Sequence, residues 1–96
     1  MNVLEHMMKL YEEGLEELMD AQKYTRCYEK VTNAEDKSMY RTLAKQELEH
    51  EAMIVKAGDR LFAGADASDS LHMVWHSLKK HLHNWRSSLE MRLADK

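Results

Sequence analysis

The chain has 96 residues with no proline, three glycines and one cysteine, and its formal net charge is −3 at pH 7. This length allows a single domain, 1–96, whose core is so small that pairing with a second copy is a natural way to bury more surface. The charge argues against nucleic acid as a partner, because no basic stripe is present to neutralise phosphates. Cys27 alone cannot form an intrachain disulfide. No apolar run approaches the ~20 residues that span a bilayer, so we expect no membrane partner and a cytoplasmic protein.

The composition and the apolar periodicity predict an all-α protein with three helices, the first over about residues 3–31. Apolar side chains recur in this segment at steps of three and four along two neighbouring lines, as in an amphipathic helix. The first line is Leu4, Met8, Tyr11, Leu15, Leu18, Gln22 and Thr25, and the second is Leu10, Glu17, Ala21, Tyr24, Tyr28 and Val31. Residues 32–36 then favour a cap or a turn.

The second helix is predicted over about residues 35–62, and the third over about residues 69–94. The line expected in the second helix is Met39, Leu43, Glu47, His50, Ile54, Ala57 and Leu61. Gly64 is a good helix terminator, and residues 65–70 form the second linker. The third helix has a nearly heptad stripe of apolar residues, which favours packing against other helices. We expect this stripe to pack either on the hairpin or against another dimer. Its members are Leu71, Trp75, Leu78, Leu82, Trp85 and Leu89.

An antiparallel pairing of the first two helices places Glu17 at the height of Glu47 and His50. Residues at one height in such a hairpin are about equally far from the turn. The midpoint between positions 17 and 47 is 32, and the midpoint between 17 and 50 lies between 33 and 34. Both midpoints fall on the break that turn chemistry predicts. At ~1.5 Å per residue the three side chains meet roughly 20–25 Å from the bend.

Three such groups at one level favour a metal site. A Glu-x-x-His sequence on a helix puts a carboxylate and an imidazole on one face, one turn apart. Buried carboxylates are unfavourable without a cation, a proton or a strong donor. One chain supplies half of the ligand set of di-iron helical bundles, and two copies supply four Glu and two His. The alternative is an ordinary polar layer on exposed helix faces.

Two segments of the chain resemble ferritin-like proteins. Residues 17–24, in which Glu17 precedes Tyr24 by seven positions, resemble their first-helix motif, and residues 43–53 resemble their second-helix motif. Over residues 5–62 the chain is most similar to encapsulated ferritins, which belong to the ferritin-like, rubrerythrin-like superfamily and carry half a bundle per chain. The resemblance implies a hairpin that homodimerisation completes to a four-helix bundle.

The resemblance also implies a function and a set of site residues. It implies a ferroxidase that oxidises Fe(II) with O₂ for iron storage, with Glu17, Glu47 and His50 as iron ligands and Tyr24 as a hydrogen-bonding neighbour. It further implies an encapsulin shell as a partner and a location within that nanocompartment, although no shell-targeting tail is recognised after Leu93. The third helix is longer than in such proteins.

Two other functions are compatible with the sequence. One is a metal-free helical oligomer that acts as an adaptor or scaffold and binds partners through the third helix. The other is a di-iron or di-manganese protein that handles peroxide, as rubrerythrins do, since Mn accepts the same Glu and His ligands as Fe.

Further polar residues have a functional and a plain interpretation. Acidic residues around Glu17 could guide Fe(II) inward or could form a solvated helix face; they are Glu13, Glu16 and Asp20. Three histidines of the third helix could chelate Zn²⁺ or Cu²⁺, but exposed or packing roles are favoured; they are His72, His76 and His83. The eight methionines are expected to fill helix interfaces.

Overall fold

The computed structural model describes residues 1–62 and 68–94, and this part of the chain consists of three helices and no strand. They are α1 (Val3–Lys30), α2 (Ala34–Phe62) and α3 (Asp69–Leu93). The predicted all-α class is confirmed, and each helix limit lies within one residue of the expected position. The expected terminator Gly64 and the linker positions 65–67 lie outside the described residues.

Short polar side chains begin the three helices. The Asn2 side chain accepts a hydrogen bond from the backbone N–H of Glu5 at 2.8 Å, and the Ser68 hydroxyl accepts one from the N–H of Leu71 at 3.2 Å. Asn33 accepts bonds from the N–H groups of Glu35 and Asp36 at 2.8 and 3.2 Å. These bonds satisfy helix donors that have no intrahelical partner. Asn33 comes three residues after the end of α1 at Lys30, so the turn between α1 and α2 is short.

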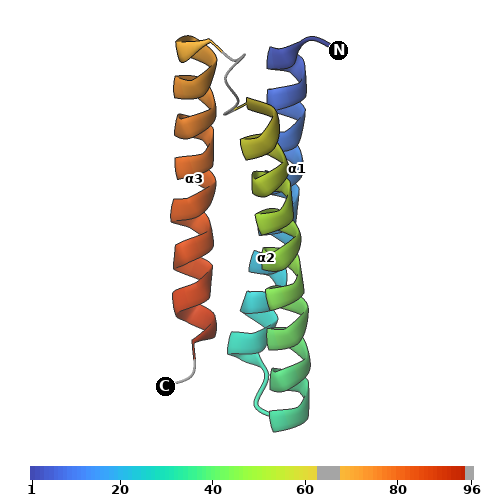
Figure 1. Ribbon diagram of the computed structural model, residues 1–96. Coiled ribbons are helices and arrows are strands. Elements are labelled where there is room, and N and C mark those ends of the chain that lie inside the picture. Colours follow the sequence, from blue (N-terminus) through green and yellow to red (C-terminus); the bar gives the residue numbers. More distant parts are fainter. Residues whose placement is uncertain (63–67, 95–96) are drawn as a thin grey trace.

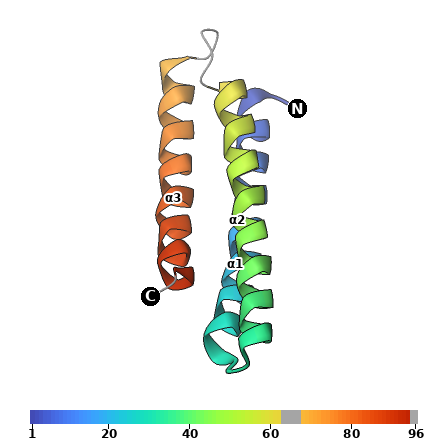
Figure 2. The same ribbon diagram turned by 60° about the horizontal axis from the view of Figure 1, so that its bottom comes forward.

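α1 and α2 form an antiparallel hairpin, and α3 runs alongside it, antiparallel to α2 (Figures 1 and 2). The molecule is elongated, with principal extents of 51 × 25 × 15 Å. The apolar stripe of α3 packs on the hairpin, which is the first of its two expected roles. The main core joins all three helices through Leu18, Ala21, Ala44, Leu48, Leu82, Leu89 and Leu93, and a second cluster comprises Met7, Phe62 and Trp75.

The buried line of α2 differs from the expected one. The buried residues of this helix are Ala44, Leu48, Glu51, Gly58 and Phe62. In the expected line, Met39 is 47% exposed and Leu61 is 51% exposed. The two lines are neighbours on one helix, and periodicity alone does not say which of them α3 covers. Glu47 and His50 lie about 100° and 160° around the helix from Leu48, on a face that α3 leaves open.

Polar contacts fix the height of α3 against the hairpin. Asp59 accepts hydrogen bonds from the Trp75 indole and the Lys79 ammonium, each at 2.9 Å. Glu51 is 2% exposed and pairs with Arg86 at 2.7 Å, and Arg86 also donates to the Leu48 carbonyl at 2.5 Å. Among the described residues the charge partner of the buried Glu51 lies on α3, so a shift of α3 along the hairpin would leave that charge unpaired.

Gly58 allows Trp75 to approach α2, and this contact gives a stability prediction. A Cβ added at Gly58 would lie 2.0 Å from the Trp75 ring. We expect Gly58→Ala to destabilise the fold, because overpacking of about 1–3 kcal/mol or more outweighs the ~1 kcal/mol gained in helix propensity. Urea unfolding followed by Trp fluorescence measures the change. At Gly14 the nearest atom is the flexible Leu82 Cδ1 at 3.0 Å, so Gly14→Ala is the control. A Gly58→Ala protein as stable as Gly14→Ala would contradict the prediction.

None of the helices in the described part of the chain combines the length and the apolar character that crossing a membrane requires.

Candidate metal centre

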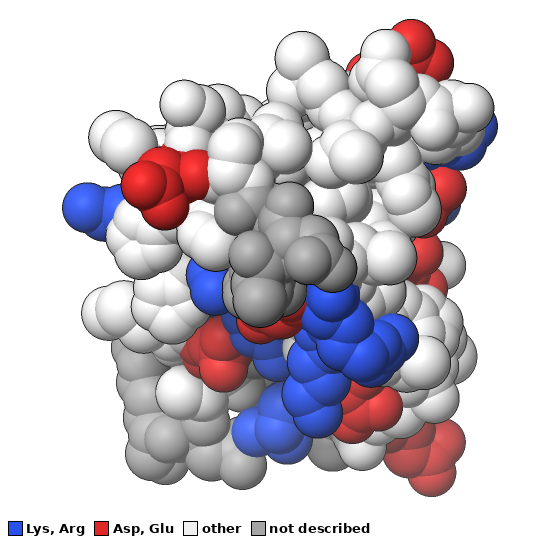
Figure 3. All heavy atoms as spheres, turned by 45° about the horizontal axis from the view of Figure 1, so that its top comes forward, with Lys and Arg blue, Asp and Glu red and all other residues white. Residues whose placement is uncertain are grey.

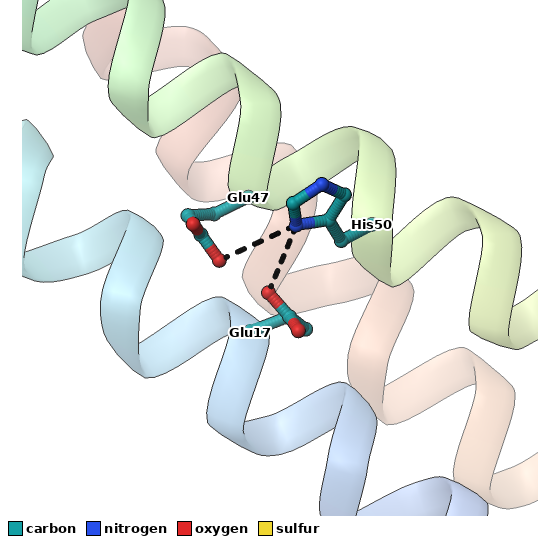
Figure 4. A group of neighbouring side chains, drawn as sticks. All are labelled: Glu17, Glu47 and His50. Carbon is teal, nitrogen blue, oxygen red and sulfur yellow. Dashed lines mark ion pairs between the residues drawn. The ribbon is translucent and has the colours of Figure 1, made fainter.

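Three potential metal ligands from two helices converge on the open face of the hairpin (Figure 4). α1 supplies Glu17, and α2 supplies Glu47 and His50. His50 Nδ1 lies 3.5 Å from Glu17 Oε2 and 3.7 Å from Glu47 Oε2. One ligand atom from each residue lies within 4.8 Å of the others, and within the described residues this is the single group of three or more ligand side chains so arranged. The hairpin therefore assembles the three residues that its turn predicts to be at one height.

The cluster is half-open, and one of its oxygen atoms is unsatisfied. The side chains of Glu17 and Glu47 are 27% and 20% exposed, whereas His50 is 54% exposed. While both carboxyl groups are ionised, the buried Oε2 of Glu17 has no hydrogen-bond donor among the described residues. A buried carboxylate oxygen without a donor is unfavourable unless a cation or a proton accompanies it. The residues present thus fit a divalent cation with oxygen and nitrogen ligands.

The two carboxyl groups are close enough to compete for a proton. A hydrogen bond with Glu47, desolvation and the negative charge of Glu47 raise the pKa of Glu17 from 4.5 to about 7, against the opposing effect of His50. The metal-free site therefore keeps a proton to a higher pH than an ordinary glutamate does. A bound cation would take the place of that proton.

This shared proton predicts a pH dependence of metal binding. Ionisation of Glu17 is completed only above pH 7, so affinity rises by up to about tenfold per pH unit below 7 and rises less steeply above it. Titration with Co²⁺, which does not react with O₂ under these conditions, measures the affinity from pH 5.5 to 8. A Co²⁺ affinity that stays flat between pH 5.5 and 7 would refute the assignment.

The folding stability of the metal-free protein depends on pH in the opposite direction. The raised pKa of Glu17 stabilises the fold at low pH, and this contribution is lost as pH rises from 4.5 through 7.

The other predicted site residues do not join the cluster. Tyr24 packs against the main core, and its hydroxyl makes no hydrogen bond to Glu17, Glu47 or His50 in the described part of the structure. Its role beside the metal stays a prediction. The acidic residues near Glu17 form an exposed face; they are Glu13, Glu16 and Asp20.

The three histidines of α3 singled out in the sequence lie apart from the Glu17–Glu47–His50 cluster. His72 is partly buried, and His76 and His83 are exposed. They are not part of any group of three ligand atoms among the described residues. The exposed or packing role that the sequence favours agrees with this arrangement.

The buried pair of Glu51 and Arg86 is not predicted from the sequence. Glu51 directly follows His50, but it points to α3 and has its charge satisfied there. Its position in the sequence indicates the buried face, because Glu51 follows Leu48 by three residues and precedes Val55 by four. Those positions define the line that α3 covers.

Comparison with known protein families, curated proteins and solved structures finds no significant match to this chain. The class that the fold and the cluster define is an all-helical protein with a candidate two-carboxylate, one-histidine metal centre.

Proposed function

We propose that two copies of the chain pair through the open face of the hairpin to form a ferritin-like four-helix bundle, and that the pair oxidises Fe(II) with O₂. The observation that carries the proposal is the buried oxygen of Glu17, which has no hydrogen-bond donor among the described residues and lies beside Glu47 and His50. As a plain polar layer this arrangement keeps a proton between the two carboxyl groups, whereas a cation in that place would complete half of a two-metal site.

The open face supports pairing. Around the cluster, α2 carries the exposed Met39 and Leu61 and the half-buried Leu43 and Ile54. α3 lies on another side of the hairpin, so it does not obstruct a second copy. Pairing would bury these apolar side chains, each gaining about 25 cal/mol per Å² removed from water. It would also bring together four Glu and two His from symmetry-related helices, which one chain cannot supply.

The chemistry of the donor groups fits iron as the substrate. Carboxylate oxygens are hard ligands that stabilise Fe(III) relative to Fe(II), and the imidazole leaves positions open to O₂. Two Fe(II) ions each lose one electron to one O₂, which takes up two protons and leaves as hydrogen peroxide. Binding of the first Fe(II) displaces the proton that Glu17 shares with Glu47. The resemblance to encapsulated ferritins further implies that Fe(III) is released to a storage shell such as an encapsulin compartment.

Anaerobic Fe(II) titration followed by addition of O₂ tests the proposal. We expect about two Fe(II) bound per pair of chains, a dimer in sedimentation analysis, and one O₂ consumed for each two Fe(II), with a rapid rise of Fe(III) absorbance. Metal content at background would support a scaffold or adaptor instead. Bound metal with no iron oxidation, but with rapid consumption of added peroxide, would support a peroxide-handling protein with Fe or Mn.

A further inference from the structure

A groove of about 460 Å³ lies between α2 and α3. Its α2 wall runs from Glu51 to Lys56, and Ala52 lies about 160° around the helix from His50. The groove is therefore on the opposite side of α2 from the candidate metal centre. A ligand in it would leave the open face of the hairpin free.

The groove combines an apolar floor with a cationic rim. Ala52 and Val55 supply apolar surface, and the methylene stems of the surrounding basic side chains extend it. The basic side chains are Lys56 from α2 and Lys79, Lys80 and Arg86 from α3, with His76 and His83 beside them. An apolar pocket with a few charged groups at its edge is the usual form of a small-molecule site.

The charges of the rim are only partly neutralised by the protein. Among the described residues that line the groove, Glu51 is the one carboxylate, and it pairs with Arg86 at 2.7 Å. Lys79 is paired with Asp59 at 2.9 Å. Lys56 and Lys80 have no ion pair or hydrogen bond among the described residues. Figure 3 shows Lys and Arg side chains clustered in one patch of the surface, with Asp and Glu side chains next to them.

We propose that this groove binds a small amphiphilic carboxylate, such as a medium-chain fatty acid. The carboxylate lies between Lys56 and Lys80, and the alkyl chain lies over Ala52 and Val55. Both parts are needed: the unpaired ammonium groups attract the anion, and the apolar floor holds the chain.

The size of the groove favours a small ligand over a docked helix. Its lining runs over residues 51–56 of α2 and 76–86 of α3, or about 8 and 15 Å at ~1.5 Å per residue. A helix as long as those of this chain would extend well beyond both ends. The volume of 460 Å³ falls within the roughly 300–1,000 Å³ range of ligand pockets.

NMR titration of the full-length protein with decanoate tests the proposal. We expect saturable binding of one decanoate per chain, with the largest shifts at Ala52 and Val55. Decylammonium has the same chain with the opposite charge, and inorganic phosphate has charge without a chain, so neither should shift these signals. Removing both unpaired charges in Lys56→Gln/Lys80→Gln should weaken binding by about tenfold. Ala52→Leu, which fills the floor at a helix-compatible position, should weaken it without changing charge.

The matched control is Lys9→Gln/Lys45→Gln, which removes two exposed lysines of α1 and α2 that do not line the groove. Its decanoate affinity should equal that of the unaltered protein. Equal binding of decylammonium, unchanged affinity in Lys56→Gln/Lys80→Gln, or no binding at millimolar decanoate would overturn the proposal. So would concentration-dependent shifts of Ala52 and Val55 without ligand, because a second copy would then occupy the groove. Decanoate binding should persist in Glu47→Ala, so its outcome is separate from that of the iron site.

Discussion

Replacing Glu47 with Ala is expected to abolish iron-dependent O₂ consumption while leaving the helical fold intact. In a symmetric pair this substitution removes two of the four carboxylates. The loss should weaken Co²⁺ binding by at least about 100-fold. Residues that only hydrogen-bond to a metal ligand contribute up to about 100-fold to affinity, and a direct ligand should contribute at least as much. A second readout is independent of turnover. Because Glu47 is the main cause of the raised pKa of Glu17, Glu47→Ala should lower that pKa toward 4.5.

Glu49→Ala is the matched control for this variant, since Glu49 is an exposed carboxylate two residues away on α2. It should keep metal binding, O₂ consumption and the pKa of Glu17. Turnover that survives in Glu47→Ala, or that falls equally in Glu49→Ala, would show that the cluster is not the reaction site. Circular dichroism of both variants checks that the helical content is unchanged.

The largest stability change is expected for Arg86→Met. This substitution leaves Glu51, which is 2% exposed, without its charge partner. Removing one member of a buried pair typically costs about 3–5 kcal/mol, which is a large share of the stability of a chain of this size. The Leu48 carbonyl also loses its Arg86 donor. Urea unfolding at pH 7 should show the loss, and near-ultraviolet circular dichroism should show that Trp75 and Trp85 leave their packed positions.

Two comparisons separate the buried charge from other effects of the substitution. Glu51→Met/Arg86→Met removes both charges and should recover most of the lost stability, because apolar side chains of similar volume can replace a buried pair. Arg92→Met breaks the exposed pair with Glu29 and should cost less than about 1 kcal/mol. If the double variant were as unstable as Arg86→Met, the buried charge would not explain the loss.

Much of the fold and of the cluster can be predicted from local sequence. Helix limits depend on caps and breakers within a few residues, such as Asn2, Asn33 and Ser68. A tight turn then determines which residues of α1 and α2 are at one height, because rise per residue is nearly constant in a helix. Counting from the turn was therefore sufficient to bring Glu17, Glu47 and His50 together.

The three helices, the hairpin and the level of the carboxylate–histidine cluster could be predicted from the sequence, because they follow from interactions between near neighbours and from helix geometry. Which line of α2 is buried depends on tertiary contacts, since two adjacent lines have similar apolar character and α3 can cover one of them. That choice buried Glu51 against Arg86 and left Glu47 and His50 on the open face. These features depend on contacts between residues far apart in the chain, which periodicity does not encode.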